Sequence, residues 1–178
     1  MAAPVTTDQL ITLIEKSNLI PPDRLDEVVK KYRASGGSED VQEMMGQLVK
    51  TGILTHFQSQ QLIQGKWRGF SIGKYKVLER LGSGGMGSVY LCEHLSMHSK
   101  VAIKVLPTAK NNDPAALGRF YREARAAGAL AHPNLVKADE IDQDGELHFL
   151  VMDFVEGVNL QQLVHRNGKG LSALRSCH

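Results

Sequence analysis

The sequence predicts an α+β fold, in which an all-α helical-hairpin region precedes a five-stranded antiparallel sheet that carries one long helix. Two observations favour this fold. Apolar residues recur at the helical spacing i, i+3, i+4, i+7 through residues 1–66. Beyond residue 74 the pattern changes to short β-branched and aromatic runs, bounded by glycine, serine, asparagine or aspartate, which are typical of strands.

The composition is that of a globular protein and argues against several classes of function. The 178 residues are 42% hydrophobic and 22% charged, with a formal net charge of +2. So small a charge gives no support to nucleic acid or an anionic membrane as a partner. Cys92 and Cys177 form no CxxC pair, so a reducing compartment is the simpler interpretation. Without a secretory signal or a membrane segment, the chain is expected to be cytoplasmic.

Residues 1–66 are predicted to form a helical module. Pro21-Pro22 predicts the start of its second helix, and Thr55 with Gln58 is a capping-box pattern that begins a fourth. A weak repeat, starting at Leu13 and again at Leu48, suggests two helical hairpins packed together. We interpret this module as a packing or docking unit, because no residue cluster supports a ligand pocket in it.

Residues 67–74 are glycine-rich and predict a linker, in which Trp67 and Phe70 are expected to pack against a neighbouring face. Five strands are expected at residues 75–81, 87–94, 100–106, 136–141 and 147–153. Between the third and fourth, Asp113 is expected to cap a long helix that begins at Pro114 and ends near Leu130. Residues 142–145 predict a hairpin turn.

The stretch ERLGSGGMGSVYL, residues 79–91, concentrates glycines between two predicted strands. Each glycine at an ordered site lowers folding stability by about 0.5–1 kcal/mol relative to alanine, so a cluster of glycines indicates a specific structural or functional requirement. A dinucleotide-binding loop would open a helix and precede an acidic residue by about twenty positions. Here the glycines are followed by the predicted strand at 87–94 and not by a helix. The residue near the end of the following strand is a lysine, Lys104, and not an acid, so the sequence does not fit a dinucleotide-binding loop. Two interpretations of the glycine-rich stretch remain, a plain hairpin turn and a loop that covers phosphates.

Lys104 decides between these two alternatives. It ends the sequence VAIK, whose apolar neighbours predict an interior strand, where an unpaired ammonium is very costly. Glu123, midway along the predicted helix, is its natural partner. Loop glycines that let backbone N–H groups lie over phosphates, together with a lysine fixed by a glutamate, predict an ATP site.

These motifs, in this order, resemble the amino-terminal lobe of a protein kinase. The matching stretches are G-x-G-x-x-G-x-V at 82–89, VAIK at 101–104, the helix glutamate, HPN at 132–134 and LVMDFVEG at 150–157. The resemblance covers about residues 75–164, a small lobe with its hinge, and is greatest to bacterial serine/threonine kinases. The style of the linker is similar to that of multi-domain receptors in planctomycete-like bacteria. The resemblance implies phosphoryl transfer from MgATP to serine or threonine of an unidentified protein substrate.

The resemblance implies that Lys104 contacts the α- and β-phosphates of ATP and that Glu123 pairs with it. The loop over the phosphates would consist of Gly82, Ser83, Gly84, Gly85, Met86 and Gly87.

For the base, the resemblance implies that Leu81, Val89 and Ala102 sandwich the adenine. Met152 takes the gatekeeper position behind it. The hinge hydrogen bonds would come from Asp153 C=O and Val155 N–H, while Asn159 stands where the family often has an acidic residue near the ribose. His132 is expected to pack the helix-to-strand connection and not to perform chemistry.

Two motifs of the family are missing from the 178 residues, the H-R-D catalytic loop and the D-F-G sequence that binds magnesium. Residues 165–167 are His-Arg-Asn and come too soon after the hinge to be the catalytic loop. We therefore expect that the chain stops before the catalytic loop, by truncation or frameshift, and that residues 165–178 begin a large lobe or form an altered tail. Alone, the chain is expected to be inactive, to lack metal ligands and to expose an apolar surface.

Two further hypotheses compete with a serine/threonine kinase. The chain is a catalytically dead ATP-binding or decoy module that docks on a kinase or scaffold through its helical region. Alternatively, residues 1–66 are the working part and the lobe is a remnant. ATP titration separates the first two hypotheses from the third.

Overall fold

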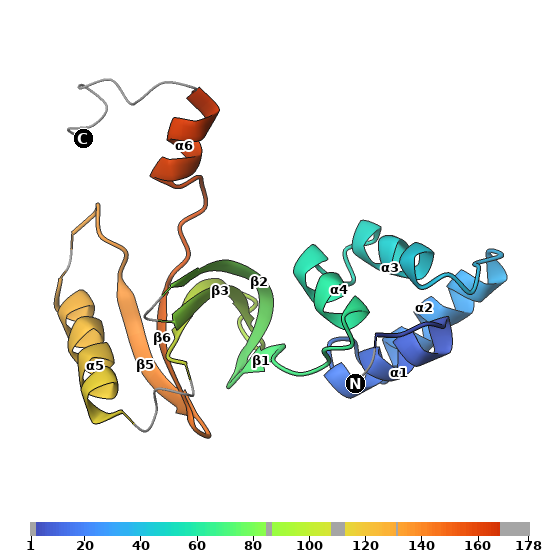
Figure 1. Cartoon of the computed structure of the whole chain (residues 1–178), viewed down its shortest axis with the longest axis horizontal. Helices are drawn as coiled ribbons and strands as arrows, with labels where there is room; N and C mark the ends of the chain where they lie inside the picture. The colour runs from blue at the N-terminus through green and yellow to red at the C-terminus, as the bar shows by residue number, and fades with distance from the viewer. Residues whose placement is uncertain (1–2, 85–86, 108–112, 131, 168–178) are drawn as a thin grey trace.

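The computed structural model describes residues 3–84, 87–107, 113–130 and 132–167 (Figure 1). Four helices come first, as the apolar spacing predicts: α1 Thr7–Ser17, α2 Pro22–Ala34, α3 Val41–Lys50 and α4 His56–Ile63. They share one apolar core, since α4 contacts both α1 and α3. Leu10, Ile14, Met44, Leu48 and Leu62 are buried in this core.

The helix boundaries agree with the predicted capping signals. Pro22 occupies the first turn of α2. The capping box of α4 is confirmed: Thr55 Oγ1 accepts the N–H of Gln58, and Gln58 Oε1 accepts the N–H of Thr55 at 2.9 Å. Helix α1 is capped by Thr6, whose side chain accepts the N–H of Gln9.

All five predicted strands are present, in one antiparallel sheet. They are β2 Tyr75–Gly84, β3 Gly87–His94, β4 Lys100–Val105, β5 Ala138–Asp144 and β6 Leu147–Asp153. A sixth, β1 Ser71–Ile72, lies within the predicted linker and pairs with the start of β2, so that the order is β1-β2-β3-β4-β6-β5. Two residues are too few for an alternating pattern, and the sequence therefore did not predict β1. Helix α5 Pro114–Ala129 has the predicted Asp113 cap, and α6 Leu160–Asn167 comes after β6.

The β5–β6 hairpin corrects the predicted turn at 142–145. Asp142, Gln143 and Asp144 are still paired with β6, and the turn consists of Gly145 and Glu146. Gly145 has φ of +59°, which a two-residue hairpin turn requires and glycine adopts without strain. The strand also begins at Ala138 rather than at Val136.

The sheet has two faces with different neighbours, because side chains alternate along each strand. One face holds a cluster that includes Val77, Cys92, Ile103, Phe149 and Val151. On the other face, Leu150 packs with Phe120 and Ala124 of α5. Burial raises the pKa of the Cys92 thiol to about 12, so it stays protonated at neutral pH.

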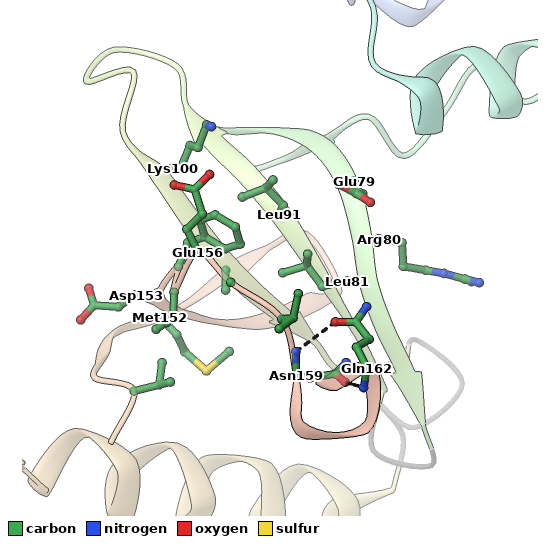
Figure 2. Close-up of a pocket in the computed structure, with 16 residues that line it drawn as sticks. Glu79, Arg80, Leu81, Leu91, Lys100, Met152, Asp153, Glu156, Asn159 and Gln162 are labelled. Carbon is green, nitrogen blue, oxygen red and sulfur yellow. Dashed lines mark hydrogen bonds between the residues drawn. The ribbon is translucent and has the colours of Figure 1, made fainter. Parts of the chain in front are cut away.

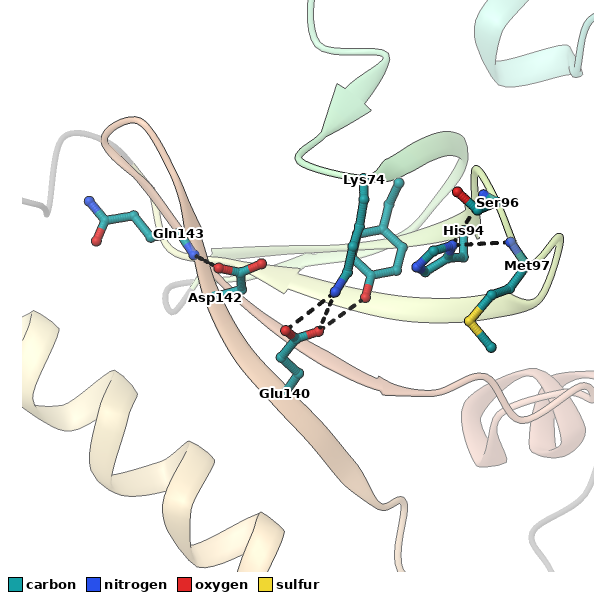
Figure 3. A network of polar contacts seen from close by, with 8 residues as sticks. Lys74, His94, Ser96, Met97, Glu140, Asp142 and Gln143 are labelled. Carbon is teal, nitrogen blue, oxygen red and sulfur yellow. Dashed lines mark hydrogen bonds and ion pairs between the residues drawn. The ribbon is translucent and has the colours of Figure 1, made fainter.

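Polar contacts join the two ends of the sheet (Figure 3). Lys74, in the β1–β2 turn, places its Nζ 3.0 Å from Oε2 of Glu140 on β5, and the hydrogen bond raises the pKa of Lys74. Asp144 Oδ2 accepts the N–H of Gly73 at 2.8 Å. Since β1 and β5 are at opposite ends of the strand order, these contacts require a strongly curled sheet. No helix in the described ranges is long and apolar enough to span a bilayer.

Candidate functional site

A cleft of about 990 Å³ opens between the curled strands and the segment after β6 (Figure 2). Six of the predicted site residues line it: Leu81, Ala102, Met152, Asp153, Val155 and Asn159. They come from β2, β4, β6 and the segment between β6 and α6, so the fold brings together positions up to 78 residues apart. The walls combine apolar side chains with charged groups, among them Glu79, Lys100 and Glu156.

The strand registers place Val89, Ala102, Lys104 and Met152 on one face of the sheet. Lys104 is opposite Val89 of β3 and Leu150 of β6. Ala102, two residues earlier on the same face, is opposite Leu91 and Met152. The side chain of Lys104 therefore projects from the same face of the sheet as Ala102, two residues further along β4, although neither Lys104 nor Val89 is among the residues that line the cleft.

Lys104 and Glu123 are paired. Lys104 Nζ lies 3.2 Å from Glu123 Oε2, which joins the end of β4 to the middle of α5. The side chain of Lys104 is 24% exposed and that of Glu123 is 45% exposed. A half-solvated glutamate contributes little stability through such a pair, but it holds the ammonium at a fixed position. The ammonium retains donors for an anionic ligand.

The segment after β6 has an unpaired backbone donor where the sequence predicts a hinge. Val155 is 68% exposed, and its N–H has no hydrogen-bond partner within the described part of the chain. The N–H of Asp153 bonds to Lys137 O at 3.0 Å, which fixes the strand end beside the cleft.

Asn159 has a structural function that the sequence did not predict. Its Oδ1 accepts the N–H of Gln162 at 2.8 Å, and Gln162 Oε1 accepts the N–H of Asn159 at 3.0 Å (Figure 2). This reciprocal pair begins α6 in the manner of a capping box. The amide NH₂ of Asn159 remains as a donor toward the cleft.

The glycine-rich stretch continues the β2–β3 ladder. Gly82, Ser83 and Gly84 are opposite Val89, Ser88 and Gly87. Gly85 and Met86, which the sequence assigns to the tip of the loop, lie outside the described residues. Gly87 has φ of +125°, and a Cβ added there would collide with the carbonyl oxygen of Val105.

His132 lies in the turn after α5, where its Nδ1 accepts the N–H of Asn134 at 3.1 Å. This agrees with a structural role in the helix-to-strand connection. No group of three or more His, Cys, Asp or Glu side chains suited to a metal ion is present among the described residues.

Sequence reasoning missed Leu91 and Lys100, which line the cleft beside predicted neighbours. The signal was available, because a period of two from Val89 leads to Leu91, and a period of two from Ala102 leads to Lys100. Apolar side chains around the cleft and the α5–β5 turn are exposed, as expected for a small lobe. They include Leu130, Leu135, Val136, Val158 and Leu160.

The sequence model of the protein kinase domain matches residues 75–174, more than half of the chain. The chain therefore belongs to the protein kinase family. Within that family its relatives are bacterial serine/threonine kinases.

The chain is 38% identical over 96 residues to serine/threonine-protein kinase PrkC of Bacillus subtilis, which covers 54% of this chain and 15% of that protein. It is 40% identical over 99 residues to PknB of Mycolicibacterium smegmatis, covering 53% and 16%. A crystal structure of the PknI kinase domain of Mycobacterium tuberculosis superposes with a TM-score of 0.50 and 28% identity, over 61% of this chain and 44% of that one. The chain spans less than a fifth of the length of these curated relatives.

Proposed function

We propose that residues 75–164 are the ATP-binding small lobe and hinge of a serine/threonine protein kinase, preceded by a helical module at 1–66 and a connection at 67–74. The observation that carries this proposal is the 3.2 Å pair of Lys104 and Glu123 on the cleft side of the sheet. A lysine held in this way offers a fixed positive charge to phosphate oxygens, which is its part in phosphoryl transfer. The cytoplasm, where ATP is available, is the corresponding compartment.

The described residues suit each part of ATP. Leu81, Val89 and Ala102 supply apolar surface for the adenine, with Met152 behind it. The Val155 N–H and the Asp153 C=O supply a donor and an acceptor for the edge of the base. Asn159 keeps its amide NH₂ for the ribose, although its Oδ1 is engaged by Gln162. Gly82 and Gly84 leave open space where phosphates would approach, since a Cβ at either position would meet no atom within 4 Å.

Magnesium would enter bound to the phosphates of ATP, where it neutralises their charge. The 178 residues contain neither the H-R-D nor the D-F-G sequence that supplies the catalytic base and the magnesium ligands in this family. We therefore propose that a polypeptide of these 178 residues binds ATP without transferring its phosphate.

Lys104→Met is expected to weaken ATP binding by about tenfold to a hundredfold, because one charge-assisted contact to phosphate is removed. Isothermal titration of the 178-residue chain with MgATP measures this change. Lys137→Met is the matched control, since Lys137 pairs with Asp139 on the surface and is not among the residues proposed to contact ATP. Equal affinity of the Lys104→Met variant and the parent chain would contradict the assigned role, and no binding by the parent chain would overturn the proposed function.

Phosphate incorporation by the 178-residue polypeptide is expected to equal the background of its Lys104→Met variant. The missing base alone is worth about 10²–10⁴-fold in rate. The measurement uses radiolabelled ATP with a basic protein substrate. Incorporation above the Lys104→Met background would show that these residues suffice for catalysis and would refute this part of the proposal.

A further inference from the structure

The helical module holds three consecutive residues of β2, the strand that leads into the glycine-rich loop. Lys76 Nζ donates to Leu19 O, between α1 and α2, at 2.9 Å. Gln58 Nε2 donates to Val77 O at 2.7 Å, and Thr55 Oγ1 donates to Leu78 O at 2.6 Å. Each of the two β2 carbonyls would otherwise face away from β3 at an unprotected strand edge.

The contact of Gln58 with Val77 is buried, and the other two are partly buried. Gln58 is fully buried, at 0% exposure, and both ends of its amide are engaged, with Oε1 on the Thr55 N–H and Nε2 on Val77 O. Burial lowers the pKa of Lys76, whose ammonium lies between the module and the sheet. Phe57 of α4 packs on Tyr90 of β3, with ring centroids 6.3 Å apart. A buried amide that lost its partner would carry the full desolvation penalty, so the module is fixed in one orientation.

The contact coincides with an irregularity in β2. Val77 is opposite Cys92 and Glu79 is opposite Leu91, so Leu78 is an extra residue in the ladder, a β-bulge. Bulges bend a strand and redirect the residues that come after them. Here the carbonyl of the extra residue is taken by Thr55 of the helical module, and Gly82 is only four residues further along the chain.

The module also adjoins the nucleotide cleft. A second hollow of about 490 Å³ is lined by Thr55, His56 and Phe57 from the module. It shares Glu79, Leu91 and Lys100 with the cleft itself. The start of α4 thus lies beside side chains that also line the nucleotide cleft.

We propose that the helical module is an intramolecular brace for the β2–β3 hairpin, and that Gln58 and Thr55 are positioning residues that set the glycine-rich loop over the nucleotide. This inference rests on the proposed ATP function. The module would affect ATP affinity by fixing the path of β2. In this proposal the buried face of residues 55–58 packs on the chain's own lobe and does not bind an external scaffold.

Two variants test the brace in the 178-residue chain. Gln58→Glu keeps an oxygen for the Thr55 N–H, and so keeps the capping box, but at pH 8 it places a carboxylate against Val77 O. Thr55→Val removes the hydroxyl from Leu78 O together with the cap. Thr6→Val is the matched control, because it removes the equivalent cap of α1 and no contact to the sheet. Thr55→Ser retains the hydroxyl and is expected to keep the amide exchange and the ATP affinity of the parent chain.

The readouts are hydrogen exchange of the β2 and β3 amides and the Kd for MgATP. We expect about tenfold faster exchange in Gln58→Glu and Thr55→Val, and ATP affinity weakened by about threefold to tenfold, with Thr6→Val and Thr55→Ser close to the parent. If Gln58→Glu does not fold, the Thr55 series alone gives the answer. If the parent chain binds MgATP and Thr55→Val binds it equally well, the inference of a brace is wrong while the proposed function stands. A parent chain that binds no ATP would overturn the proposed function and this inference with it.

Discussion

Phe149→Ala is expected to lower the free energy of unfolding by about 3–5 kcal/mol, which is most of the stability of a small lobe. Phe149 has no exposed surface and sits at the centre of the sheet cluster. Its ring meets Tyr75 edge-on, with centroids 6.3 Å apart, and its edge lies under the backbone of Gly73 in the β1–β2 turn. Truncation leaves a cavity bounded by paired strands, which cannot collapse to fill it.

Chemical denaturation followed by circular dichroism measures this loss. Leu95→Ala is the matched control, since Leu95 lies in the β3–β4 turn and is 52% exposed. It is expected to change the free energy of unfolding by no more than about 0.5 kcal/mol. A Phe149→Ala variant as stable as Leu95→Ala would show that the face carrying Phe149 is not the core of the lobe.

The sequence was sufficient to predict those features that depend on residues close together in the chain. Thr55 and Gln58 form the predicted capping box, and Asp113 caps α5, because a cap depends on residues two or three positions apart. The strands were found from their β-branched and aromatic runs and the turn residues that bound them, although β2 continues beyond the predicted end at Leu81 to Gly84. Glycines carry no side-chain pattern, so periodicity cannot tell a strand from a loop there.

The contact of the helical module with the sheet was not predictable in the same way. Periodicity shows that Gln58 lies on a helix, but it does not show that its amide reaches the carbonyl of Val77, nineteen residues away. The bulge at Leu78 is equally invisible, because an extra residue changes the ladder and not the composition. Lys104 and Glu123 were predictable because a lysine among apolar neighbours needs a partner, and the single helix between the strands offered one.

Gly87→Ala is expected to destabilise the lobe by about 2–5 kcal/mol, whereas Gly82→Ala and Gly84→Ala are expected to cost about 0.5 kcal/mol or less. The backbone of Gly87 has φ of +125°, which an alanine adopts only with strain. The added methyl would also collide with the carbonyl oxygen of Val105 and crowd Pro107. That carbonyl belongs to β4, which is paired on both sides, so it cannot retreat.

The other two glycines have open space around them and need no special backbone. In the proposed function, the phosphate chain of ATP approaches these two positions, and the absent side chains would leave room for it. Gly82→Ala and Gly84→Ala should therefore weaken MgATP binding while leaving thermal unfolding nearly unchanged, and Gly87→Ala should lower the unfolding temperature whether or not nucleotide is present. Thermal melts with and without MgATP separate these effects. Unchanged ATP affinity in both Gly82→Ala and Gly84→Ala would mean that the hairpin does not cover the nucleotide, and its glycines would then require another explanation.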